Sequence, residues 1–309
     1  MHQFIGEQWA YSLINYIAFV VMMIYSLFYY NSKRDVISLY SKYVIHRASC
    51  INIYFGKGFK FILASAESLI MAYMINLSSY MNVPFGKLIG TGGNYFALLF
   101  LTPIAWFVIS AILIINPLKQ ADITTMCVPV YLFFVKIACF CQGCCWGIPW
   151  EHGLYNYHSS HPGNQVPVQA IEAFWAVAIF IFLLWYRKKA KCGTMYPMYM
   201  ILYSATRFPV EFLSAAHEKI IGPFNTYHIL CAIGVGIGLL LLLIVNLFGE
   251  KISNIFESAH NKLDEKMMLK AELNAQAIEE KNSQMETERK ERLEKTKKAR
   301  EKASIKYKK

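Results

Sequence analysis

Three side chains within the segment 195–215 place a charge pair and a phenol inside an otherwise apolar run. Tyr203, Arg207 and Glu211 are spaced four residues apart, so on a helix they lie along one face, with neighbouring side chains about 6 Å apart. Arg suits phosphate because its planar guanidinium donates two parallel hydrogen bonds. Two interpretations fit the pattern. Either Arg207 and Glu211 neutralise each other for packing, or Arg207 faces a polar cavity and Glu211 orients it.

Two further apolar segments carry ionisable groups. Lys136 lies near the end of the segment 122–141, where it either extends to the membrane surface or provides a second cation for the same cavity. Gln169 and Glu172 are three residues apart and share a helix face. Near a helix start, Glu172 also suits the positive end of the helix dipole. An ionisable group in hydrocarbon is costly unless it is paired or hydrated, so each is a functional hypothesis.

Four of the eight cysteines gather in the stretch KIACFCQGCCWG, Lys136–Gly147. The spacing Cys-x-Cys-x-x-Cys-Cys matches no familiar zinc motif, and we favour the interpretation that small residues here allow close helix packing. A disulfide and a metal site stay open as alternatives. His152, His158 and His161 would be ligands only if they approached these thiols. We therefore predict neither a metal nor a cofactor.

The elements that must position these residues are apolar segments of membrane-spanning length. Of the 309 residues, 56% are hydrophobic and 17% charged, with a mean hydropathy of +0.32, which is too apolar for a soluble domain of this length. The apolar residues form blocks of about 20, the length that crosses a bilayer core. We predict an all-α membrane protein with seven transmembrane helices: roughly 8–31, 59–80, 95–115, 122–141, 166–186, 195–215 and 226–248.

Lys and Arg concentrate in alternate connections between these predicted helices. The connections 32–58 and 187–194 and the end of the chain are rich in both residues. In contrast, 142–165 contains neither, and 81–94 and 216–225 contain one Lys each. Because short cytoplasmic loops carry the excess of positive charge, we predict that the N-terminus lies outside and the C-terminus lies in the cytoplasm.

Composition changes abruptly after residue 248. Residues 249–309 are rich in Lys and Glu, and apolar residues recur at helical spacing only up to about residue 280. We predict a membrane domain, 1–248, and a charged cytoplasmic helix within 249–309, whose last part is either a solvated single helix or disordered. Most of the net charge of +11 lies in the predicted cytoplasmic connections and this basic tail taken together. There it can bind anionic lipid headgroups, so the charge implies no nucleic-acid partner.

Three segments together resemble one family, the bacterial prolipoprotein diacylglyceryl transferases. The stretch Lys136–Gly147 resembles the family signature, Pro167–Ala173 (PVQAIEA) resembles its Pro–x–Gln–x–x–Glu–Ala, and Tyr203–Phe212 resembles its Tyr–x3–Arg–x3–Glu–Phe. The resemblance covers about residues 8–248 and not the tail. It implies an enzyme of the bacterial cytoplasmic (inner) membrane that moves diacylglycerol from phosphatidylglycerol to the lipobox cysteine of a prolipoprotein signal peptide. A thioether forms and glycerol phosphate leaves.

The resemblance also implies roles for single residues. Arg207 would hold the lipid phosphate and stabilise the charge that grows on the leaving group, while Glu211 would orient Arg207. Tyr203 could donate a hydrogen bond to the phosphate or the glyceryl ester, and Lys136 completes the predicted catalytic set. Gly147 would allow close approach of the backbone. The other predicted substrate-binding residues are Tyr11, Thr91, Gly92, Gly93, Cys139, Gln169 and Glu172.

Three positions depart from the family pattern. Thr91 stands where the family usually carries a His, the natural group to take the proton from the incoming thiol. Lys136 replaces an Arg and so keeps the charge but loses the planar fork. Val166 replaces a frequent His. These departures leave a second hypothesis open, a catalytically impaired relative that acts as a membrane lipid-binding or scaffold protein. A transporter is a third class, but the sequence lacks the two matching halves typical of transporters.

Overall fold

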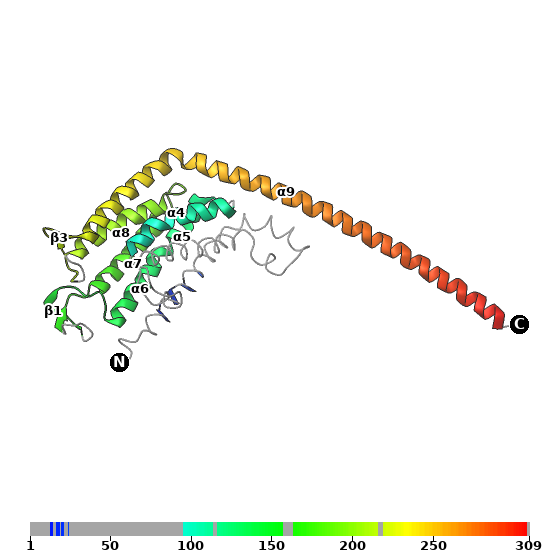
Figure 1. Cartoon of the computed structure of the whole chain (residues 1–309), viewed down its shortest axis with the longest axis horizontal. Coiled ribbons are helices and arrows are strands. Elements are labelled where there is room, and N and C mark those ends of the chain that lie inside the picture. The colour runs from blue at the N-terminus through cyan, green and yellow to red at the C-terminus, as the bar shows by residue number, and fades with distance from the viewer. Residues whose placement is uncertain are drawn as a thin grey trace. The chain divides into compact units, whose positions relative to one another are not determined.

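A computed structural model describes residues 95–113, 116–156, 163–215 and 219–307, together with single positions between 13 and 24 (Figure 1). These residues are mostly helical. The chain forms two compact units, Met1–Glu257 and Ser258–Lys309. The predicted helix 59–80 and most of 8–31 lie outside the described residues.

Helices make up most of the described part of the first unit. They are α4 (Tyr95–Leu113), α5 (Pro117–Thr125), α6 (Val128–Gln142), α7 (Val168–Tyr186), α8 (Met195–Glu211) and the beginning of α9 (Thr226–Tyr307). Among the described residues, three segments are long and apolar enough to cross a membrane: Pro117–Gln142, Val168–Tyr186 and Thr226–Ala259. The chain is therefore a helical membrane protein, and the total of seven spans stays a prediction.

The predicted helix 122–141 differs from the observed structure in two ways. It begins earlier, at Pro117, and a turn at residues 126–127 divides it into α5 and α6. Asn116 caps the N-terminus of α5, because its Oδ1 accepts a hydrogen bond from the backbone N–H of Leu118 at 3.0 Å. Pro129 lies in the first turn of α6, where its missing N–H costs no helical hydrogen bond.

Packing of α6 on α7, of α7 on α8, of α4 on α5 and of α5 on α8 builds the core of the described part of the first unit. Large side chains such as Trp106, Leu132 and Tyr199 are almost completely buried there. The start of α8 is fixed by Asp122 of α5, whose carboxylate accepts the backbone N–H of Gly193 at 2.6 Å. This contact ties α8, which carries Arg207, to the neighbouring helix pair.

Two short antiparallel hairpins, which the sequence interpretation did not predict, complete the first unit. β1 (Pro149–Asn156) pairs with β2 (Gly163–Gln165), and β3 (Lys219–Ile221) pairs with β4 (Phe224–Asn225). The first hairpin lies in the connection 142–165. All four strands flank helix ends, so they connect the helices without adding to the helical core.

Helix α9 runs for 82 residues, from Thr226 to Tyr307. The sequence left a solvated single helix and disorder open for the last part of the tail, and α9 includes this part up to Tyr307. Within Ser258–Lys309, nearly every described side chain is exposed, as expected for a helix in which charges of both signs alternate.

Candidate functional site

A buried network of four charged side chains joins α6, α7 and α8. Glu172 of α7 lies at its centre: its Oε2 is 2.6 Å from Nζ of Lys136, and its Oε1 accepts a hydrogen bond from Nη1 of Arg207 at 2.7 Å. Nη2 of Arg207 donates to Oε2 of Glu211, one helical turn further along α8. Two cations and two carboxylates therefore share one site, and their formal charges cancel.

These four charged side chains are buried, so each must be paired to avoid the cost of an isolated charge away from water. The exposed fraction of the side chain is 14% for Lys136, 5% for Glu172 and 9% for Arg207. Removing one partner from a buried ion pair leaves an uncompensated charge, which typically costs about 3–5 kcal/mol. Each of these residues thus depends on the others, although they come from three helices.

Asn225 of β4 extends the network and was missed by the sequence interpretation. Its Nδ2 donates to Oε1 of Glu211 at 2.8 Å. Its Oδ1 accepts the backbone N–H of Tyr227 at 2.9 Å and that of His228 at 3.2 Å, which caps the start of α9. An Asn just before an apolar run is a recognisable cap signal, but nothing local in the sequence indicates its bond to Glu211.

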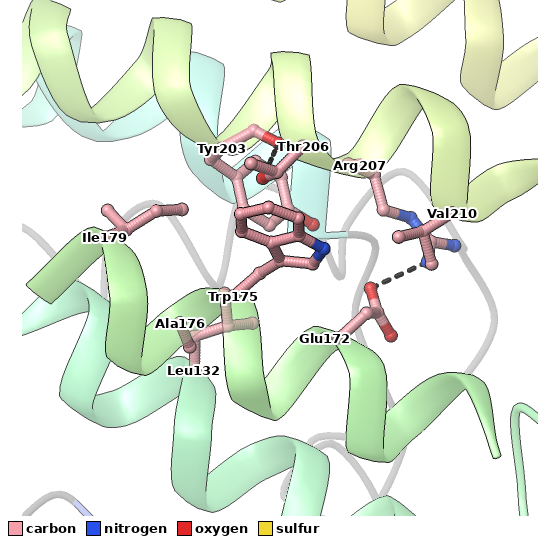
Figure 2. A pocket seen from close by; sticks show the side chains of 9 residues that line it. All are labelled: Leu132, Glu172, Trp175, Ala176, Ile179, Tyr203, Thr206, Arg207 and Val210. Carbon is pink, nitrogen blue, oxygen red and sulfur yellow. Dashed lines mark hydrogen bonds and ion pairs between the residues drawn. The ribbon is translucent and has the colours of Figure 1, made fainter.

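A pocket opens beside the network, between α6, α7 and α8 (Figure 2). Its empty space is about 230 Å³ when the open solvent at its mouth is included. Its lining residues are Leu132, Glu172, Trp175, Ala176, Ile179, Tyr203, Thr206, Arg207 and Val210. Trp175 and Thr206 are two lining residues that the sequence interpretation did not single out.

The two ends of this pocket differ in polarity. Figure 2 shows Glu172 and Arg207 together at one end and Ile179 and Ala176 at the other, with Trp175 between them. A pocket that is charged at one end and apolar along its walls matches an amphiphile, whose head needs hydrogen-bond donors and whose tail needs apolar contact.

Tyr203 lines the pocket as part of an aromatic cluster. Its ring centroid is 4.6 Å from that of Tyr95 and 6.1 Å from that of Tyr199. Tyr95 and Tyr199 in turn share a hydrogen bond between their hydroxyl groups. The four-residue spacing of Tyr203, Arg207 and Glu211 therefore places all three side chains in the buried interior of the helix bundle.

The geometry bears on the alternatives for Lys136, Glu172 and Arg207. Lys136 does not extend to the surface, because its side chain is mostly buried and pairs with Glu172. Helix-end charge alone does not account for Glu172, because its carboxylate binds two cations. Both interpretations of Arg207 fit the structure: it pairs with Glu211, and it also lines the pocket.

The other predicted site residues fall into two groups. Gln169 is buried, and its Nε2 donates a hydrogen bond to the carbonyl oxygen of Cys144. Cys139 is also buried, and its Sγ lies within 4.8 Å of that of Cys144. At Gly147, a Cβ atom would overlap the carbonyl oxygen of Leu213 and lie 2.8 Å from Cγ2 of Val168. Packing within the protein therefore already requires glycine there. The second group lies outside the described residues: Tyr11, Thr91, Gly92 and Gly93.

Apolar helices of membrane-spanning length and a buried, charge-balanced network beside a pocket define an integral membrane protein with a polar site inside its helix bundle. Sequence comparison gives the family. The profile of the prolipoprotein diacylglyceryl transferase family matches residues 8–244, which confirms the resemblance found in the three motifs. The chain belongs to the prolipoprotein diacylglyceryl transferase family.

Similar proteins carry the matching name at moderate identity. The chain is 33% identical over 102 residues to the phosphatidylglycerol--prolipoprotein diacylglyceryl transferase of Clostridium tetani, covering 31% of this chain and 41% of that protein. It is 32% identical over 142 residues to transferase 2 of Clostridium perfringens, covering 44% and 56%. It is 32% identical over 101 residues to the phosphatidylglycerol--prolipoprotein diacylglyceryl transferase of Idiomarina loihiensis, covering 31% of this chain and 37% of that protein. The alignments thus span about half or less of these relatives.

Proposed function

We propose that this protein transfers diacylglycerol from phosphatidylglycerol to the lipobox cysteine of prolipoproteins in the bacterial cytoplasmic membrane. The observation that carries the proposal is the position of Arg207, paired with two carboxylates at the charged end of an amphiphilic pocket. The names of the relatives support the reaction and its two substrates, phosphatidylglycerol and a prolipoprotein signal peptide.

The proposed topology has seven transmembrane helices, with the N-terminus outside. Residues 1–248 form the membrane domain in this topology, and 249–309 form a cytoplasmic tail. The alternating Lys and Arg content of the connections supports this orientation. It places the end of α6 and the connection 142–165 on the outer side, where a translocated signal peptide would present its thiol.

Binding of an anionic headgroup to the pocket requires one carboxylate to move. The network is neutral, so a phosphate entering beside Arg207 and Lys136 competes with their carboxylate partners. Glu172 lines the pocket, whereas the side chain of Glu211 is fully buried and held by Asn225. Glu172 is therefore the carboxylate that yields, and Glu211 keeps the guanidinium oriented toward the phosphate.

The transfer is a substitution at the carbon of the diacylglyceryl group that bears the phosphate. The thiol sulfur forms a bond to this carbon, the carbon–oxygen bond to phosphate breaks, and its electron pair leaves on the phosphate oxygen of glycerol phosphate. Arg207 stabilises the charge that develops there. The proton of the thiol needs an acceptor. Glu172, released from Arg207, is our candidate for this role because it lies on the pocket wall.

Complementation in cells that lack their own transferase tests the proposal, with the mass of a model lipoprotein as the readout. The intact chain should add a diacylglyceryl group, and Arg207→Ala should abolish the addition while the protein still inserts. Arg187→Ala, at an exposed position after α7, is the matched control and should retain activity. Normal lipidation by Arg207→Ala would remove the proposed role of this residue.

The second hypothesis is a lipid-binding relative without transfer activity. Measurements on the intact chain distinguish it from the enzyme. Failure of the well-inserted chain to lipidate, combined with retention of phosphatidylglycerol by the purified protein, would favour it over the enzyme.

A further inference from the structure

Three of the clustered cysteines meet where α6 ends. Cys139 lies in the last turns of the helix, and Cys144 and Cys145 lie in the turn that follows. Their Sγ atoms all lie within 4.8 Å of one another. The neighbouring Cys141 is not part of this cluster.

The spacing of the sulfur atoms is close to that of a metal-thiolate centre. In a tetrahedral zinc site the Zn–S distance is about 2.3 Å, which puts two coordinating sulfurs about 3.8 Å apart. The Sγ atoms of Cys144 and Cys145 are 3.7 Å apart. Small side-chain rotations would therefore bring all three sulfurs onto one ion without moving the helix.

The backbone of the turn is specified by several independent contacts. Gly143 ends α6 with φ = 76°. Cys145 follows with φ = 62°, the single non-glycine residue with positive φ among those that the structure describes. Gln169 of α7 donates to the carbonyl oxygen of Cys144 between them. Unfavourable backbone conformations of this kind persist where the surroundings enforce them, often at ligand clamps.

Charge and exposure also suit metal binding. Lys136 precedes Cys139 by three residues on α6, so the cation lies on the same side of the helix, and a nearby cation favours the thiolate form that binds metals. Exposure increases from the buried Cys139 through Cys144 to the exposed Cys145. The cluster thus has an inner wall and an outer opening through which an ion can enter.

We propose that Cys139, Cys144 and Cys145 form a binding site for a soft metal ion of the zinc class. Thiolates select such ions over hard cations, and each thiol releases its proton to solvent on coordination. Three protein ligands leave a fourth position for water. Although the unfamiliar spacing of the cysteines predicts no metal, the fold brings the thiols together through a helix end and a left-handed turn, which spacing alone does not reveal.

Metal binding would rigidify the turn Gly143–Cys145, which lies in the chain between the charge network residue Lys136 and Gly147. It would join the end of α6, which carries Lys136, to the segment that follows the turn. In that segment Gly147 donates its N–H to the carbonyl of Val166 at 2.8 Å, and Ile148 donates its N–H to the carbonyl of Leu213 at 2.9 Å. The proposed role is structural support of the outer end of the site and does not depend on the transfer reaction.

Cobalt(II) binding to the purified full chain in detergent tests the proposal. The protein is reduced with a phosphine, stripped with a chelator and titrated with Co²⁺, and thiolate-to-cobalt charge-transfer absorption is recorded. We expect binding of about one ion per chain, displacement by Zn²⁺, and a higher thermal unfolding temperature with Zn²⁺. Cys145→Ser and Cys144→Ser should each weaken binding at least tenfold.

Cys141→Ser and Cys192→Ser are the matched controls, because both residues lie outside the cluster. They should bind Co²⁺ like the unaltered chain. If Cys139→Ser fails to fold, Cys145→Ser still decides the question, because its side chain is exposed. Absence of the charge-transfer band, an equal band in the Cys144→Ser, Cys145→Ser double variant, or a disulfide within the cluster that persists after phosphine treatment would each overturn the proposal.

Discussion

Charged side chains occur in two parts of the chain under opposite conditions. In the helical bundle, Lys136, Glu172, Arg207 and Glu211 are few, buried and paired with one another. In Ser258–Lys309, charged residues are numerous, and nearly all described side chains are exposed. The residue types are the same, but water screens only the second set.

This difference predicts where a substitution matters. An exposed ion pair contributes about 0–1 kcal/mol to stability, because solvent screens it and ordering two long side chains costs entropy. A buried charge that loses its partner cannot recover its hydration, so removal of one partner is several times more costly. The bundle should therefore be sensitive to single charge changes and the tail should tolerate them.

Neutralising Glu211 should have the largest effect on stability. Glu211→Gln leaves Arg207, Lys136 and Glu172 with a net positive charge, at a position where the side chain is fully buried. We expect a loss of about 3–5 kcal/mol in the free energy of unfolding, measured as denaturant unfolding in detergent. The same change at the exposed Glu250 of α9 is the control. Equal shifts for the two variants would contradict the comparison.

The pair Lys136–Glu172 should show strong coupling between its members. Lys136→Met alone leaves a negative charge in excess and Glu172→Gln alone a positive one, whereas the double variant leaves the neutral pair Arg207–Glu211. We expect the double variant to be more stable than the sum of the single effects predicts, with a coupling energy of about 0.5–3 kcal/mol. Unfolding of the four proteins of the cycle measures this. Additive effects would mean that Lys136 does not depend on Glu172.

Much of the helical framework could be predicted from apolar length alone. The predicted helix 166–186 is observed as Val168–Tyr186, and 195–215 is observed as Met195–Glu211. The division of 122–141 into two helices was not predicted, because a short turn in front of Pro129 leaves the hydropathy almost unchanged. Local composition thus predicts the existence of helices better than their ends.

Polar residues that share one helix face were easier to predict than the partners they bind on other elements. Tyr203, Arg207 and Glu211 follow from helical spacing, because they lie on one element. The bond between Arg207 and Glu172 joins residues 35 positions apart, and it depends on how α7 packs on α8. Asn225 joins Glu211 through a similar non-local contact. Such contacts form only after the helices assemble, so a single sequence without its fold does not specify them.

A smaller effect is expected at the exposed pair between α5 and α9. Nζ of Lys119 is 2.5 Å from Oε1 of Glu257, and the side chains remain 52% and 44% exposed. Glu257→Gln should therefore lower the free energy of unfolding by less than about 1 kcal/mol, and added salt should reduce the difference further. The measurement is the same detergent unfolding as for Glu211→Gln. A loss as large as that of Glu211→Gln would show that exposure does not determine the cost.

Deleting 258–309 should have the smallest effect on lipid chemistry. The three family motifs and the described pocket all precede this segment. A cut after Glu257 also keeps Ser253, whose hydroxyl accepts a hydrogen bond from Asn116 at 2.6 Å. The truncated chain should lipidate a model substrate like the full chain, as measured by complementation and mass. Loss of lipidation in a well-inserted truncation would mean that the charged helix acts on the site itself, and the two parts could then no longer be treated as independent.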